Sequence, residues 1–247
     1  MNLVGDLPVL WRMLRGQPEA ADHQSRLDGF YRPQAERYDA FREKLLHGRR
    51  ELFTALDLPE GGVLVELGGG TGRNLEFLGE RLGRLWRVYL VDLCPALLER
   101  AEQRCRRNGW NNVIPVLADA CTWRPPIPVN AVACSYSLSM IPDWFAAVDN
   151  AATMLRPGGV FGAVDFYVAR RHPPAGLARH SFFTRTFWPA WFGHDGVHPD
   201  ADHLPYLLKR FARERLDERR GTVPWLPAVR VPWYLFLGYQ MVPANAS

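Results

Sequence analysis

One stretch of this sequence breaks an apolar strand into glycines and restarts as a helix: Val63-Leu64-Val65-Glu66-Leu67-Gly68-Gly69-Gly70-Thr71-Gly72-Arg73-Asn74. Glycine permits backbone turns with φ > 0 and lets a ligand come within contact distance of the main chain, while the first amides of the next helix face that ligand. The stretch therefore predicts a small-molecule binding loop at the end of a buried strand.

Two acidic residues accompany this loop. Glu66 lies two residues before Gly68, and Asp92 ends a second apolar strand over 87–92. An acid at the tip of the second strand holds a ribose diol in mononucleotide-binding α/β folds. The glycine spacing is G-x-G-x-G instead of G-x-G-x-x-G, and the short loop has nothing shaped for a pyrophosphate, so NAD binding is the weaker alternative. Together these residues resemble class I S-adenosylmethionine-dependent methyltransferases, whose glycine loop holds the methionine part of the cofactor and whose second-strand acid holds the ribose.

The resemblance implies further cofactor contacts along the same edge of the sheet. Asp119 follows a third strand, where these enzymes place an acid that accepts from the adenine amino group; a helix N-cap is the structural alternative. Glu66 could instead orient the loop through backbone amides. With S-adenosyl-L-methionine as cofactor and S-adenosyl-L-homocysteine as product, the predicted cofactor-binding residues are Tyr38, Glu66, Gly68, Gly69, Gly70, Thr71, Gly72, Asn74, Asp92, Leu93, Asp119, Ala120 and Ser135.

Length and composition favour a single α/β unit. The chain has 247 residues, 47% of them hydrophobic, which is enough to bury a full core. Four cysteines are scattered without a C-x-x-C pair, so neither a disulfide framework nor a zinc ribbon is expected, and a reducing cytoplasm is the simplest location. No stretch approaches the ~20 apolar residues of a membrane span, so we expect a soluble or peripheral protein.

Strands and helices alternate through the middle of the chain, which predicts a doubly wound, mostly parallel sheet. Strands are expected at 63–67, 87–92, 113–117, 130–136 and 159–166, with helices at 72–82, 95–108 and 143–155. A short helix at 204–211 and strands at 213–218 and 233–239 follow, which makes a seven-stranded sheet.

Segments on either side of this alternation complete the expected domain organisation. Residues 1–60 are predicted to form an N-terminal helical lid, with helices at 27–38 and 41–56 and a break at Gly48. Residues 61–240 form the methyltransferase domain. Its insertion after the fifth strand, 168–205, is rich in proline, histidine and aromatic residues and is predicted to be irregular and to form the substrate side.

The positive charge is supplied mainly by arginine, and it gathers in the C-terminal half. The formal net charge is +4, and arginines between 170 and 230 are interleaved with Trp188, Trp191, Trp225 and Trp233. Such a mixture suits a surface that contacts anionic lipid with its indoles at the interface. The alternative is a solvated face with core tryptophans.

Four residues are predicted to lie at the reacting group of the substrate: Tyr31, Tyr136, Trp191 and His194. Tyr136 ends the fourth strand, at the edge where open α/β sheets hold substrates, although an aromatic side chain there is about as often packing. His194 could take a proton at neutral pH because its ordinary pKa is near ~6.5. His194 and His198 also invite a metal interpretation, but Gly196 opposes a shared helical face, so no metal is predicted.

Longer stretches resemble one family, the methyltransferases of betaine-lipid synthesis. They are residues 31–42, Gly48-Arg49-Arg50, the loop 67–74, the run Phe187-Trp188-Pro189-Ala190-Trp191-Phe192-Gly193-His194-Asp195-Gly196-Val197 and the tail 221–234. The Trp-Phe-Gly-His-Asp-Gly run and the Pro-Trp-Leu-Pro tail are the more diagnostic parts. The resemblance implies successive N-methylation of diacylglyceryl-homoserine to the betaine lipid diacylglyceryl-trimethylhomoserine.

This resemblance also implies partners and a location. The partners would be the amino-lipid substrate, an anionic membrane surface and a separate upstream aminocarboxypropyl transferase, with no nucleic acid, and the protein would be peripheral at the inner membrane face. Aromatic side chains would stabilise the growing cation; Tyr38 could alternatively hold the carboxylate of the cofactor. Two alternatives stay open: a soluble small-molecule or quinone-type methyltransferase, and a cofactor-binding module without turnover.

Overall fold

The computed structural model describes residues 43, 45–193, 196–224 and 226–241. The predicted helix at 27–38, with Tyr31 and Tyr38, lies outside these residues, as does His194.

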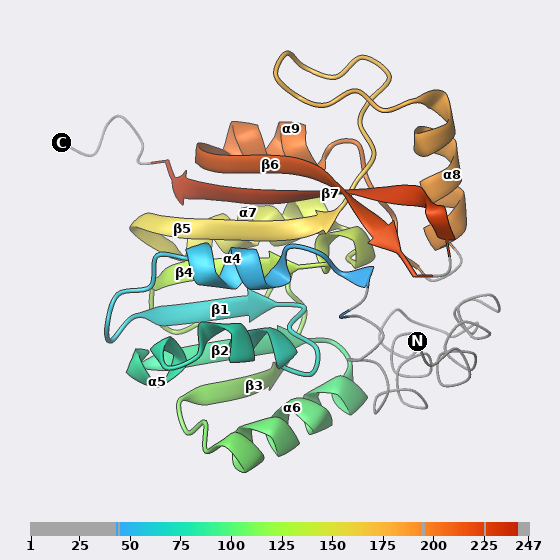
Figure 1. The fold of residues 1–247 in the computed structure, drawn as a ribbon. Coiled ribbons are helices and arrows are strands. Elements are labelled where there is room, and N and C mark those ends of the chain that lie inside the picture. Colours follow the sequence, from blue (N-terminus) through green and yellow to red (C-terminus); the bar gives the residue numbers. More distant parts are fainter. Residues whose placement is uncertain (1–42, 44, 194–195, 225, 242–247) are drawn as a thin grey trace, which may run out of the picture.

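A seven-stranded sheet organises the described residues, in the order β3-β2-β1-β4-β5-β7-β6 (Figure 1). The first five strands pair in parallel, whereas β7 is antiparallel to both β5 and β6. The strands are β1 (Val63–Leu67), β2 (Arg87–Asp92), β3 (Val113–Leu117), β4 (Val129–Ser135), β5 (Leu155–Phe166), β6 (Phe211–Val223) and β7 (Leu226–Gln240). The predicted seven-stranded α/β sheet is confirmed, but it is mixed, because a hairpin supplies its last two strands.

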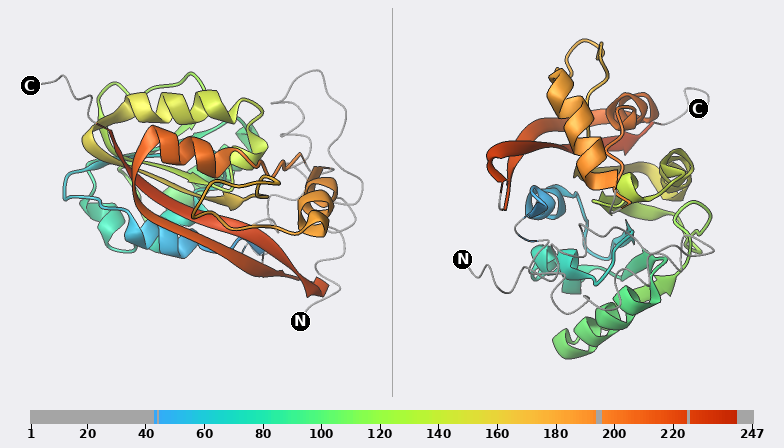
Figure 2. Two further views of the ribbon diagram at one scale, coloured as in Figure 1. Left: turned by 90° about the horizontal axis from the view of Figure 1, so that it is seen from above. Right: turned by 90° about the vertical axis from the view of Figure 1, so that its right-hand side faces the viewer.

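Helices cover both faces of the sheet (Figures 1 and 2). Side chains alternate along β1, so that Leu64 enters one core and Val63, Val65 and Leu67 enter the other. The first core is covered by α4 (Arg49–Ala55), the 3₁₀ helix η1 (Arg73–Leu78), α5 (Arg81–Arg84) and α6 (Pro95–Asn108), and the second by α7 (Trp144–Met154) and α9 (His203–Arg210). The 3₁₀ turn η2 (Leu138–Met140) precedes α7.

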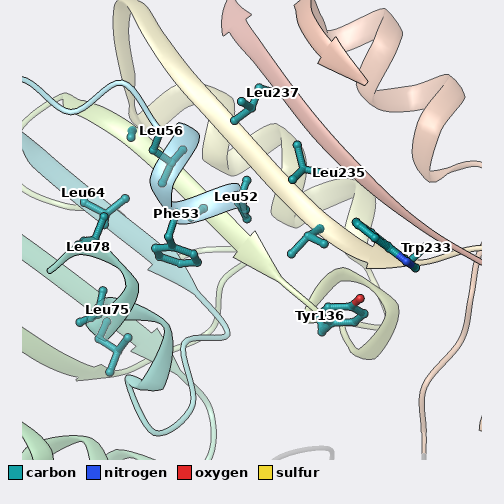
Figure 3. Packing of buried hydrophobic residues seen from close by; sticks show 14 of the residues in the cluster. Leu52, Phe53, Leu56, Leu64, Leu75, Leu78, Tyr136, Trp233, Leu235 and Leu237 are labelled. Atoms are coloured by element: carbon teal, nitrogen blue, oxygen red, sulfur yellow. The ribbon is translucent and has the colours of Figure 1, made fainter. Parts of the chain in front are cut away.

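Helix α4 brings the N-terminal part of the chain onto the middle of the sheet. Its Leu52 and Phe53, and Leu56 directly after it, lie buried against side chains of β1, η1 and β7 (Figure 3). The predicted break at Gly48 is confirmed: its φ is +77°, and a Cβ there would lie 2.4 Å from the ring of Trp233. Only glycine therefore allows the chain to enter α4 beneath β7.

The structure corrects several predicted elements. The helix expected at 72–82 is two short helices, η1 and α5, because Gly79 interrupts it with φ +56° and ψ −133°. The strands expected at 213–218 and 233–239 are the long β6 and β7, which extend because each finds its ladder partner in the other. The insertion 168–205 is not irregular throughout: it contains α8 (Phe182–Gly193), whose Thr184, Trp188 and Phe192 share one buried face.

Candidate active site

The glycine loop is folded against the ends of the neighbouring strands. The amides of Gly68 and Gly69 donate to the carbonyl of Val91 at 2.8 and 3.1 Å. Gly68 has φ +69°, and a Cβ there would lie 2.4 Å from the Cβ of Ser137. A Cβ on Gly69 would lie 2.2 Å from Leu90 Cδ1. The loop thus needs glycine both for its backbone angles and for its close approach to the chain around it.

Asp92 holds this loop while it faces the candidate binding cavity. Its Oδ2 accepts from the amide of Gly70 at 2.8 Å, and its Oδ1 accepts from the amide of Cys94 at 2.8 Å. A carboxylate offers about four acceptor positions, so these two bonds are compatible with a ligand hydroxyl as well. The residue predicted to bind a ribose diol is therefore also the one that positions the glycine loop.

A cavity of about 290 Å³ opens along the carboxyl edge of β1, β2 and β4. This volume lies near the lower end of small-molecule sites. Its wall is mainly apolar, with acids at Asp92, Asp119 and Asp143. The lining residues are Gly68, Gly70, Val91, Asp92, Leu93, Leu97, Ala118, Asp119, Ala120, Cys121, Tyr136, Ser137, Met140, Ile141, Pro142 and Asp143. Gly68, Gly70, Asp92, Leu93, Asp119, Ala120 and Tyr136 were predicted from the sequence; the strip 137–143 was not.

Asp119 lines the cavity, as the cofactor role requires. Its alternative role as a helix N-cap is wrong, because no helix begins there: its Oδ1 accepts from the amide of Cys121 at 2.8 Å within a turn that leads to β4. Burial and the nearby carboxylate of Asp119 raise the pKa of the Cys121 thiol to about 12. Cys121 therefore contributes a neutral thiol to the cavity wall and not a nucleophilic thiolate.

Glu66 and Asn74 lie behind the loop, in a buried chain of hydrogen bonds. Asn74 Nδ2 donates to Glu66 Oε1 at 2.7 Å, and Arg49 Nη1 donates to Asn74 Oδ1 at 3.1 Å. All three side chains are buried. This chain of hydrogen bonds connects α4 to the end of β1 through the side chain of Asn74; orientation of the loop by Glu66 through backbone amides stays a prediction. Thr71 is likewise held from behind, since its hydroxyl accepts from Arg104 of α6 at 2.9 Å.

Tyr136 lines the cavity in a strained backbone conformation. Its φ is +54°, the one positive value among the described residues other than glycine. Its hydroxyl donates to the carbonyl of His47 at 2.8 Å, and its ring meets Phe166 edge-on at a centroid distance of 4.6 Å. Strain of this kind gathers at functional sites. Tyr136 thereby joins the cavity wall to the segment that enters α4.

Ser137 shapes the cavity, whereas the predicted Ser135 does not line it. Ser135 is buried in β4 and is absent from the wall. Ser137 lines the wall, and its hydroxyl donates to the carbonyl of Leu67 at 2.8 Å. Period-2 alternation cannot separate 135 from 137, since both positions would share one face, and the left-handed backbone at Tyr136 that follows β4 is not visible in the sequence.

Three of the four tryptophans predicted to face a membrane lie among the described residues, and Trp225 lies outside them. Trp188 and Trp233 are buried in the core, which contradicts their predicted place at an interface. Trp191 is exposed on α8, stacked on Phe187 at 5.7 Å, and it does not line the cavity. On α8 the buried face runs through Thr184, Trp188 and Phe192, four positions apart, and Trp191 lies beside it at 38% exposure.

The histidines of the insertion 168–205 bear on whether it could hold a metal ion. His203 is completely buried and packs edge-on against Trp144 at 4.6 Å. Burial lowers the pKa of His203 to about 4, so it is neutral in the core. No group of three or more potential ligands occurs among the described residues, and His194 lies outside them.

Asp165 was missed from the sequence, although it is an acid inside an otherwise apolar strand. It is buried in β5; Ser139 donates to it from its hydroxyl at 2.6 Å and from its amide at 3.0 Å. Burial raises the pKa of Asp165 to about 6, although the hydrogen bonds from Ser139 act in the opposite direction and lower it. The carboxylate therefore anchors η2, the turn that carries Met140 into the cavity wall.

Comparison with known proteins agrees with this geometry. Residues 64–159 match the family model described as "Methyltransferase domain". A protein-L-isoaspartate O-methyltransferase of Methanothrix thermoacetophila is 31% identical over 105 residues, 42% of this chain and 47% of that protein. A ubiquinone biosynthesis O-methyltransferase of Xylella fastidiosa is 29% identical over 180 residues, 64% of this chain and 70% of that protein.

A solved structure shows the same fold. The N-methyltransferase NodS of Bradyrhizobium japonicum, in complex with S-adenosyl-L-homocysteine, superposes with a TM-score of 0.54 at 18% identity, over 83% of this chain and 86% of that one. The chain spans about half the length of the isoaspartate methyltransferases that it matches.

The cavity fits the cofactor that this fold implies, S-adenosylmethionine. The glycine loop is a cradle that a Cβ would fill, Asp92 is suited to a diol, and the apolar wall around Leu93 and Ile141 is suited to a flat purine. Among the residues that the structure describes, none forms a helix long and apolar enough to cross a membrane.

Proposed function

We propose that this chain, whose residues 64–159 form a class I S-adenosylmethionine-dependent methyltransferase domain, is an N-methyltransferase of an amino-lipid. The substrate would be diacylglyceryl-homoserine and the product the betaine lipid diacylglyceryl-trimethylhomoserine. One observation carries this choice. The first part of the diagnostic run, residues 187–193, lies on α8, which stands beyond the carboxyl ends of the parallel strands, on the side where the cofactor cavity opens (Figure 1).

The cofactor, when bound, supplies a methyl group that its sulfonium already activates. The chain's own task is then to hold an amine in line with that group and to keep water away. The glycine loop and Asp92 would position the cofactor, and the apolar wall beside Met140 would exclude water. No strong chemical catalyst is needed for the methyl transfer itself.

Each transfer needs an unprotonated amine, because an ammonium has no lone pair. The hydroxyl proton of Tyr136 is directed to the carbonyl of His47, so Tyr136 is better suited to present its ring than to accept a proton. His194 is our candidate for the base, since histidine titrates near ~6.5. The ring of Tyr136 would stabilise the accumulating positive charge, at about 0.5–2 kcal/mol for one aromatic face.

A diacyl substrate requires the enzyme to come to the membrane. Exposing acyl chains to water costs about 0.8 kcal/mol for each CH₂, so the lipid does not leave the bilayer. We therefore propose peripheral binding at the inner, cytoplasmic face of an anionic membrane. The substrate would come from an upstream aminocarboxypropyl transferase on a separate domain or protein.

A soluble quinone-type methyltransferase is the second candidate. The observation in its favour is the 29% identity to a ubiquinone biosynthesis O-methyltransferase over 64% of this chain. A cofactor-binding module without turnover is a third possibility. The glycine loop and Asp92 argue against it, because both of these parts of the cofactor site are complete.

One experiment separates these functions. Labelled S-adenosylmethionine is incubated with the protein and, in separate tubes, with diacylglyceryl-homoserine in detergent and a soluble catechol. We expect label in the lipid, and a loss of about 1–3 kcal/mol of cofactor binding in Asp92→Ala, by calorimetry. Label in the catechol alone would identify the soluble enzyme, and cofactor binding without any labelled product would identify the binding module.

A further inference from the structure

We propose that the outer aromatic face of α8 is the surface that docks this protein on an anionic lipid bilayer. This face consists of Phe182, Phe183, Phe187 and Trp191. The inference rests on the proposed function for the identity of the substrate, and it names the element that brings the active site to that substrate.

Helix α8 has two faces of opposite exposure. Its inner face is buried in the core at Trp188 and Phe192. On its outer side, Phe182 is 74% exposed, Phe183 is 58% exposed and Trp191 is 38% exposed. A helix needs only one apolar stripe to pack on its own domain, so packing on the residues that the structure describes does not explain the second stripe.

Half-buried Phe187 joins the exposed rings of Phe183 and Trp191 into a continuous ridge. Phe183 stacks on Phe187 at a centroid distance of 5.0 Å, and Phe187 stacks on Trp191 at 5.7 Å, because residues four positions apart share a helix face. Scattered exposed aromatics are ordinary, but a contiguous exposed ridge marks an interaction surface.

The charge around this ridge selects an anionic partner. Residues 166–193 contain four arginines and neither aspartate nor glutamate. Arg170 is paired with Asp202 at 2.5 Å. The other three, Arg171, Arg179 and Arg185, make no ion pair with the residues that the structure describes. Aromatic residues with arginines close to them in sequence suit the headgroup region of an anionic bilayer, where rings insert and guanidinium groups meet phosphates.

The position of α8 links docking to catalysis. The helix lies beyond the carboxyl ends of the parallel strands, in front of the sheet when the molecule is viewed from that edge (Figure 2, right). The cofactor cavity opens at the same edge, between β1, β2 and β4. A bilayer that receives the ridge would therefore present its headgroups to the active-site side of the domain.

The test is partition onto vesicles made of equal amounts of phosphatidylglycerol and phosphatidylcholine, measured by sedimentation of the full chain. Phe182→Ser with Phe183→Ser removes two exposed rings and should weaken binding by at least about tenfold. Trp86→Ser is the matched control, because Trp86 is 52% exposed next to β2 at the opposite edge of the sheet, and it should bind as the wild type does. Arg171→Gln with Arg179→Gln should weaken binding to these vesicles and leave binding to pure phosphatidylcholine unchanged, and raised salt should act as the arginine variant does.

The outcomes separate this inference from the proposed function. Partition needs no turnover, so normal docking by a protein that methylates no amino-lipid would refute the function and leave the docking surface standing. Equal partition of the phenylalanine variant and the wild type would overturn the docking surface, even if the lipid is methylated in detergent. If the wild type instead self-associates through this ridge and does not bind vesicles, the ridge is a contact surface between two copies of the chain. That result would also overturn the proposal.

Discussion

Replacing Gly68 by alanine adds one methyl group where the cofactor loop approaches Ser137 closely. The backbone there has φ +69°, and the new Cβ would lie 2.4 Å from the Cβ of Ser137. The left-handed conformation costs a non-glycine residue about 1–2 kcal/mol, and forced overpacking typically costs about 1–3 kcal/mol. Gly68→Ala should therefore lower the free energy of unfolding by roughly 2–5 kcal/mol.

Two other glycines serve as controls that separate the cost of the left-handed backbone from the cost of overpacking. Gly61 also has φ +69°, but nothing lies within 4 Å of a Cβ built there, so Gly61→Ala should cost only the backbone term, about 1–2 kcal/mol. Gly83 lies in α5 with open space around its Cβ position, and it is absent from the residues of positive φ. Gly83→Ala should leave stability unchanged or raise it slightly.

The assay is urea unfolding of each variant, together with calorimetric titration of S-adenosylmethionine. Ser137 lines the cavity, so displacing it should weaken the cofactor as well as the fold. In Gly68→Ala with Ser137→Gly, the colliding Cβ is gone, and the two changes should couple favourably by about 1–3 kcal/mol. An equal loss of stability in Gly68→Ala and Gly61→Ala, with unchanged cofactor affinity, would refute the argument that this loop closes on Ser137.

Two further predictions concern buried polar groups. The pKa of Asp165 is raised from 3.8 to about 6 in the folded protein, so its contribution to stability is largest at low pH and is lost as the pH rises through 6. Asp165→Asn should remove the corresponding fall in the free energy of unfolding between pH 4 and 7, measured by urea unfolding. An unchanged pH dependence in this variant would contradict the prediction. Arg49→Ala removes the donor to Asn74 and should cost about 1–3 kcal/mol; Arg50→Ala, at an exposed position, should stay within about 0.5 kcal/mol, and equal losses in the two variants would show that the buried chain of hydrogen bonds adds nothing.

Local patterns were enough to predict the part of the fold nearest the cofactor. The glycines after β1 and the acid at the end of β2 are close in sequence to the strands that carry them, so spacing predicted both the loop and the position of Asp92. The five parallel strands were predictable for the same reason, since each is a short apolar run followed by a helix or a turn. Asp119 was found because it directly follows β3.

Long-range packing decided what spacing could not. Ser137 lines the cavity just beyond the left-handed backbone at Tyr136, which follows the end of β4. Asp165 is anchored to Ser139, a partner 26 residues away. No local sequence pattern predicts that an acid within an apolar strand will accept a hydrogen bond from a hydroxyl group far away in the sequence.

The sequence by itself determined the α/β class, the glycine cradle and the acid suited to a ribose, because these depend on backbone angles and strand ends that neighbouring residues impose. Only the tertiary structure decided which aromatics are core and which are surface. Trp188 and Trp191 lie three positions apart, yet one is buried and the other is exposed. The direction in which a helix turns its faces is set by the domain it packs against, and that contact joins residues far apart in the chain.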